Sequence, residues 1–135
     1  CLQILTTHNT RRLPLNYWKW LGCNMCRVLV TGGRNYSNYA AVDRVLRALC
    51  PSVIIHGGAR GADSLCGHWA RVNGVAEIAC PADWNAHGKR AGFLRNVTML
   101  AHAPDCVVSF PGGNGTAHMV ATASSKGFRV LPVLE

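Results

Sequence analysis

Three glycine-rich stretches of this 135-residue chain have the composition of loops that hold phosphate groups. They are Gly32–Tyr36, His56–Asp63 and Pro111–Thr116. Glycine lets the backbone approach a ligand closely, and the free N–H groups at the start of a following helix attract anions. Arg34 and Arg60 lie inside two of these stretches, where a planar guanidinium can donate two hydrogen bonds to a phosphate. The pattern therefore predicts a binding site for an anionic ligand.

Each of these stretches follows a short, largely apolar run, which is typical of a strand buried on both faces of a sheet. Five such runs occur: Val28–Thr31, Val53–His56, Val75–Ala79, Cys106–Phe110 and Arg129–Val133. Amphipathic segments lie between them, and this alternation predicts the α/β class. We expect a Rossmann-like three-layer fold with a mainly parallel five-stranded sheet in the order 3-2-1-4-5. Ligands bind beyond the carboxyl ends of such strands, so the crevice should open between the first and fourth strands.

The segments between the strands carry apolar residues at helical spacing. The faces expected to be buried are Val42, Val45, Leu46 and Leu49; Leu65, Trp69 and Val72; Leu94, Val97 and Ala101 in a helix over Ala91–Ala101; and Thr116, Met119, Val120 and Ala123. Gly74 and Gly127 follow two of these segments, where glycine commonly ends a helix.

The residues predicted to bind the ligand come from the three loops and from the helix after the third strand. They are Gly32, Gly33, Arg34, Tyr36, Gly57, Gly58, Arg60, Gly61, Asp63, Arg95, Asn96, Gly112, Gly113, Gly115 and Thr116. We expect the last four to hold an anionic group at the start of a helix, with Arg34 and Arg60 neutralising the remaining charge. The glycines could instead serve tight turns alone. Asp63 could bind a ribose hydroxyl, act as a weak catalytic candidate, or stabilise its own helix start.

Composition narrows the class of protein. Lys and Arg number 14 against six acids, which favours an anionic partner such as a nucleotide or nucleic acid. No run approaches the roughly 18 apolar residues of a membrane span. Seven cysteines cannot all pair within one chain, which favours free thiols in a cytoplasmic protein. The histidines show no metal-ligand spacing, so we predict no metal site and no cofactor; homo-oligomerisation stays open.

The first 24 residues differ from the rest of the chain, because they show neither helical nor strand periodicity. We expect residues 1–24 to be a dispensable extension, flexible or non-native, and residues 25–135 to form the domain.

Four motifs taken together resemble the YspA-type, cpYpsA-related branch of the SLOG superfamily, over about Arg27 to Val133. They are Arg27–Tyr36, His56–Asp63, Arg95-Asn96 followed by Met99, and Pro111–Ala117. The superfamily also contains the LOG phosphoribohydrolases and the DNA-processing protein DprA. The resemblance implies a Rossmann-like fold, a nucleotide or nucleotide-derived ligand such as a nucleotide-sugar or ADP-ribose, and a bacterial or phage source. It implies no established reaction for this branch.

The chain departs from these relatives at positions that matter for catalysis. LOG enzymes carry PGGxGTxxE with a catalytic Glu, and this chain has Met119 at that position. A thioether cannot act as a general acid or base. His118 and Asn38 stand where YspA-like sequences often carry acids. We therefore favour ligand binding, with a hydrolase acting on a nucleotide N-glycoside or phosphoribosyl bond as the alternative, and a DprA-like nucleic-acid binder as the second alternative.

Overall fold

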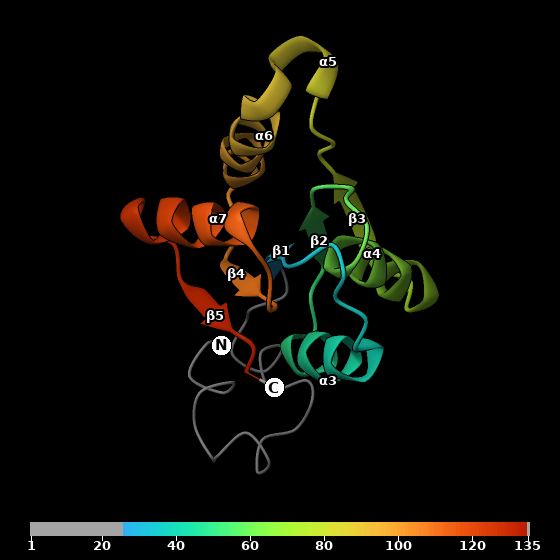
Figure 1. Cartoon of the computed structure of the whole chain (residues 1–135). Helices are drawn as coiled ribbons and strands as arrows, with labels where there is room; N and C mark the ends of the chain where they lie inside the picture. The colour runs from blue at the N-terminus through green and yellow to red at the C-terminus, as the bar shows by residue number, and fades with distance from the viewer. Residues whose placement is uncertain (1–25, 135) are drawn as a thin grey trace.

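The computed structural model describes residues 26–134, which fold around one five-stranded sheet (Figure 1). The strands are β1 (Arg27–Thr31), β2 (Val53–His56), β3 (Ala76–Ala79), β4 (Cys106–Ser109) and β5 (Val130–Pro132). Their order is β3-β2-β1-β4-β5 and every pairing is parallel. The predicted α/β class and strand order are therefore confirmed, and the sheet is parallel throughout rather than mainly. The expectations for residues 1–24 lie outside the described residues.

Alternate residues of the central strands face opposite layers of helices, as the strand period requires. Val28 and Val30 of β1 belong to the core on the side of α3 (Tyr39–Leu49) and α4 (Ala62–Val72). Leu29 between them belongs to the core on the side of α6 (Ala91–Leu100) and α7 (Asn114–Ser125). Each such side chain, once buried, stabilises the fold by about 1.5–3 kcal/mol. These two cores hold the carboxyl ends of β1 and β4 in fixed positions.

Two of the predicted helix faces are wrong in part. Val72 of α4 is 65% exposed, because it points away from the buried Ala70, and residues two apart on a helix are about 200° apart. On α6, Leu94 and Val97 are 39% and 46% exposed, whereas Asn96 is only 2% exposed. The buried side of this helix instead contains Ala91, Met99 and Leu100 together with Asn96.

The connection from β3 to α6 projects beyond the sheet, at the top of Figure 1. It contains α5 (Trp84–His87) and the 3-10 helix η2 (Gly88–Arg90), and neither buries a residue. Asp83 caps α5 by accepting a hydrogen bond from the Ala86 N–H at 3.0 Å, so this carboxylate has a local structural use. Among residues 26–134, no helix has the length and apolar character needed to cross a membrane.

A buried histidine connects β2 to β3 at the edge of the sheet. The Gly58 N–H donates to Nδ1 of His56 at 3.0 Å, which leaves the ring proton on Nε2, 2.7 Å from Oε2 of Glu77. Arg71 of α4 binds the same carboxylate at 2.8 Å. The turn after β2 is thus stabilised by polar contacts that run from Gly58 through His56 and Glu77 to Arg71.

We expect the folded state to lose stability in acid through Glu77. The hydrogen bond from His56 lowers the pKa of Glu77, with a smaller contribution from Arg71. A lowered folded-state pKa means that this stabilisation is present above the unfolded-state pKa of about 4.3 and is lost as pH falls through the folded value. The melting temperature of Glu77→Gln should lie below that of the wild type at about pH 7 and approach it at about pH 3. An equal gap at both pH values would contradict this.

Candidate functional site

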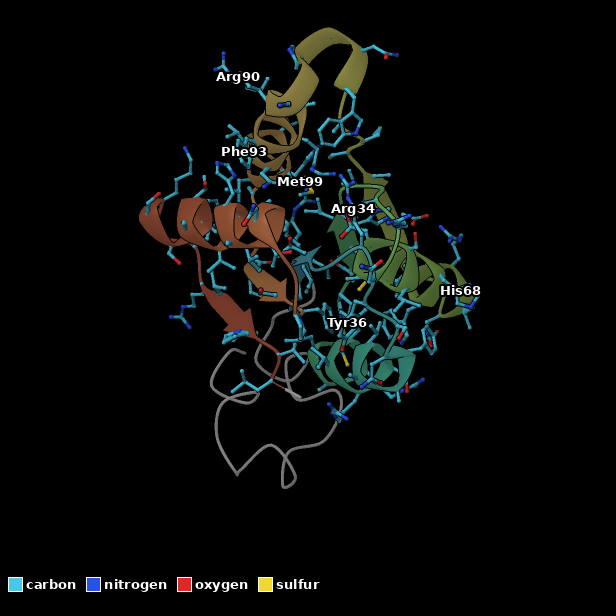
Figure 2. The ribbon with its side chains drawn as sticks, in the orientation of Figure 1. Arg34, Tyr36, His68, Arg90, Phe93 and Met99 are labelled. Carbon is cyan, nitrogen blue, oxygen red and sulfur yellow. The ribbon has the colours of Figure 1, made fainter. Side chains whose placement is uncertain are left out.

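A cavity of about 730 Å³ opens between the carboxyl ends of β1 and β4. Its walls are the loop after β1, the loop between β4 and α7, and the inner side of α6, with Asp63 and Trp84 at its margin. We call it the main cavity. Figure 2 shows Phe93 and Met99 along α6, with Arg34 on the neighbouring loop after β1. This is the place predicted for the crevice, where the connections from β1 and β4 run to opposite faces of the sheet.

The loops around the main cavity are held together through the backbone of Gly33. Its N–H donates to the Pro111 carbonyl at 2.9 Å, and its carbonyl accepts from the Ala62 N–H at 3.1 Å. The second bond satisfies one of the free N–H groups at the start of α4, which has no side-chain cap. One residue therefore connects the loops that follow β1, β2 and β4.

Several glycines are required by this close packing. A Cβ on Gly33 would lie 2.9 Å from the Pro111 carbonyl oxygen, and a Cβ on Gly112 would lie 2.6 Å from the Gly33 nitrogen. Gly61 has a φ of +78°, and a Cβ there would overlap the backbone of Gly33 and Arg34. For these positions the simpler interpretation, that glycine serves the turn and the packing, accounts for the residue type.

Gly113 and Gly115 are different. An ideal Cβ built on either residue meets no atom within 4 Å, and neither residue has a positive φ. Both line the main cavity at the first turn of α7. Glycine is about 1 kcal/mol less favourable than alanine inside a helix. Neither packing nor backbone conformation therefore explains why residue 115 is a glycine. Open space beside the backbone of two residues that line the cavity is compatible with the close approach of a ligand.

The start of α7 offers backbone donors to this space. Gly113 is its N-cap residue and no side chain caps the helix. Thr116, 9% exposed, lines the cavity at the same turn. The first N–H groups of a helix carry a partial positive charge, which makes this a suitable place for a phosphate or carboxylate.

Asp63 organises the loop after β2. Its Oδ2 accepts hydrogen bonds from the N–H groups of Gly57 at 3.0 Å and Ala59 at 3.3 Å. Burial raises the pKa of Asp63, and the bond from Ala59 and the charge of Arg95 act in the opposite direction. The carboxylate lines the main cavity but is already used by the backbone, which favours its structural role over that of a ribose ligand.

Arg95 and Asn96 connect α6 to the loop after β2 and to the first turn of α7. Arg95 donates from Nη1 to the Gly57 carbonyl at 2.7 Å, and the Asn96 amide donates to the Gly115 carbonyl at 3.2 Å. The same Asn96 amide lies 3.2 Å from Nδ1 of His118. These contacts explain why a polar residue occupies the buried side of α6.

A second hollow of about 380 Å³ adjoins the main cavity, and we call it the side pocket. Gly57, Gly58 and Arg60 line the side pocket, whereas Gly61 lines neither hollow. Arg34 and Arg95 line both. The other predicted residues line the main cavity, and these are Gly32, Gly33, Tyr36, Asp63, Asn96, Gly112, Gly113, Gly115 and Thr116. The predicted set is thus divided between two neighbouring spaces.

Two aromatic side chains of the main cavity were missing from the predicted set. Trp84 is 48% exposed, and the guanidinium carbon of Arg34 lies 5.6 Å from the centre of its ring. Phe93 is 45% exposed and its ring stacks on His118 at 4.2 Å. Trp84 could have been predicted as a site residue from its position in a polar connection that follows a strand. Exposed aromatic rings in a basic surrounding are a feature of sites that bind nucleobases.

Met119, which stands where LOG enzymes carry their catalytic Glu, is fully buried on α7. It belongs to the same core as Leu29 and Met99. This position supplies an apolar contact to the sheet and no carboxylate to the cavity.

The parallel sheet, its strand order and a glycine-lined cavity at the point where the order reverses define a Rossmann-like α/β protein. The sequence profile of the YspA, cpYpsA-related SLOG family matches residues 26–87, and the chain belongs to this family. A relative is the Gene 61 protein of Mycobacterium phage D29, which is 39% identical over 119 residues, covering 79% of this chain and 95% of the relative. The predicted family is therefore confirmed.

Proposed function

We propose that this protein binds a nucleotide-derived ligand in the main cavity, with an anionic group of the ligand at the first turn of α7. The observation that carries the proposal is the open space at Gly113 and Gly115, which the packing and the φ values of the protein leave unexplained. Arg34 and Lys89 line the same cavity and add positive charge. Membership of the SLOG family supports a nucleotide-related ligand.

Ligand binding is favoured over hydrolysis because the main cavity, within residues 26–134, offers no carboxylate that is free to act as a general acid or base. Asp63 is the carboxylate that lines the main cavity, and two backbone N–H groups occupy its Oδ2. Met119 has no acid–base chemistry. We also place the protein in the cytoplasm, a proposal that the free, buried thiols of Cys26, Cys66, Cys80 and Cys106 support.

The test is calorimetric titration of the wild type with AMP, ADP-ribose and ribose 5-phosphate, compared with Gly115→Ala. The added methyl group should weaken binding about tenfold, equivalent to about 1.4 kcal/mol, because it projects into the space that the ligand occupies. The apo variant should be as stable as the wild type or more stable by up to about 1 kcal/mol, because alanine is the better helix former.

The control is Gly127→Ala, beyond the other end of α7, which should leave ligand binding unchanged. Two results would contradict the proposal: no binding of any of the three compounds, or equal binding by the wild type and Gly115→Ala.

A further inference from the structure

The side pocket collects positive charge. Three arginines line it, Arg34, Arg60 and Arg95, and its other lining residues are Gly57, Gly58, Ala59, Pro81, Ala82 and Trp84. No carboxylate is among these lining residues, so the hollow presents guanidinium groups and backbone without an acid to neutralise them. Phosphate groups are the usual partners of such an arrangement, because two parallel N–H groups of one guanidinium match two phosphate oxygens.

The charges of Arg34 and Arg60 are available for a ligand. Both residues are exposed, and within residues 26–134 neither takes part in an ion pair. The Arg34 guanidinium lies over the ring of Trp84 instead.

Within the described part of the chain, Arg95, unlike the other two arginines, makes a hydrogen bond that helps to hold the loop after β2. Its guanidinium donates to the Gly57 carbonyl and lies near Asp63. Burial lowers the pKa of Arg95, the charge of Asp63 raises it, and the charge of Arg34 lowers it again. Like charges therefore lie close together here, and an anion bound between them would relieve their repulsion.

The side pocket and the main cavity are immediate neighbours on the protein surface. Arg34, Ala59, Trp84 and Arg95 line both spaces. One ligand can therefore extend from the first turn of α7 into the side pocket without leaving the protein surface. The exposed indole of Trp84 stands at the junction, where a flat nucleobase can stack on it.

We propose that the side pocket binds a second phosphate of the same ligand, so that the ligand carries phosphate groups on both sides of one nucleoside. This inference rests on the proposed function, which supplies the first phosphate position at Gly113 and Gly115. The chemistry is shared by a free nucleoside bisphosphate and by the 5′-phosphorylated end of a single-stranded oligonucleotide. In each, one phosphate lies on α7 and the next lies between Arg34 and Arg60.

The test compares the affinities of AMP and adenosine 3′,5′-bisphosphate by titration calorimetry. The wild type should bind the bisphosphate at least about tenfold more tightly, because the second phosphate gains charge-assisted hydrogen bonds. In Arg60→Ala the ratio of the two affinities should fall toward one. Arg44→Ala removes an exposed arginine on α3, remote from both hollows, and should keep the wild-type ratio.

The outcomes separate this inference from the proposed function. If AMP binds and the bisphosphate binds no more tightly, or if Arg60→Ala and Arg44→Ala have equal ratios, the side pocket is no phosphate site and the proposed function stands. If neither compound binds, this inference fails, and the proposed function is then decided by the titrations with ADP-ribose and ribose 5-phosphate. A 5′-phosphorylated adenine hexanucleotide distinguishes the sources: tighter binding of the hexanucleotide than of the bisphosphate, again dependent on Arg60, assigns the site to nucleic-acid ends. Tighter binding of the bisphosphate assigns it to a free nucleotide.

Discussion

Replacing Gly61 by Ala should destabilise the protein by about 2–5 kcal/mol, a large part of the 5–15 kcal/mol that holds a typical domain. Two penalties combine. A side chain at the φ of +78° carries a strain of about 1–2 kcal/mol. The new Cβ would also overlap the backbone of Gly33 and Arg34, and overpacking of this kind costs about 1–3 kcal/mol. Urea unfolding monitored by circular dichroism measures the change.

Gly127→Ala is the matched control for this stability measurement. Gly127 has a similar φ of +84°, but no atom lies within 4 Å of its ideal Cβ. It should therefore show only the conformational part of the penalty, about 1–2 kcal/mol. Equal losses in the two variants would mean that the loops after β1 and β2 can separate at little cost, and that Gly33 does not fix them.

Replacing Gly113 by Val should reduce ligand affinity more than tenfold, more than about 1.4 kcal/mol, and leave the protein folded. Gly113 has a φ of −100° and free space around its Cβ position, so the protein itself does not oppose a side chain there. Ligand binding should be opposed, because the valine side chain would fill the space in front of the α7 N–H groups. Gly113→Ala should show a smaller loss, so that affinity falls with side-chain size.

The measurement is titration with the compound that the wild type binds best, together with a melting curve for each variant. Unchanged affinity across Gly113, Ala and Val would place the anionic group elsewhere. A melting temperature that falls in step with affinity would instead attribute the loss to the fold.

Much of the fold could be predicted because buried parallel strands and their glycine-rich ends are local signals. The run Val53–His56 is apolar up to its last residue, and its strand has the predicted bounds. The strand order followed from the placement of the glycine loops. The orientation of α6 could not be predicted, because Leu94 and Val97 of the predicted stripe are exposed and the buried side contains Asn96. Its partner Gly115 is 19 residues away, and only the folded chain brings the two together.

The candidate site was predicted by residue type more accurately than by role. The sequence treats Gly33, Gly61 and Gly113 alike, whereas the structure separates the first two, which the backbone packing requires, from the third, which it does not. The roles of Asp63 and Arg95 depend on contacts across 6 and 38 residues of sequence. Spacing alone carries no information on such contacts.

The central place of β1 has a consequence for the order in which the chain can fold during synthesis. One neighbour, β2, follows β1 after the single helix α3. The other neighbour is β4, whose Cys106 pairs with Val28 across 78 residues of sequence. Until β4 emerges from the ribosome, one side of β1 is an open edge with unpaired N–H and carbonyl groups, a template for pairing with another chain. The segment that matches the family profile, residues 26–87, ends before β4 and α7. A fragment of that length would therefore contain the loops of Arg34 and Arg60 but lack the main cavity. We expect such a fragment to aggregate.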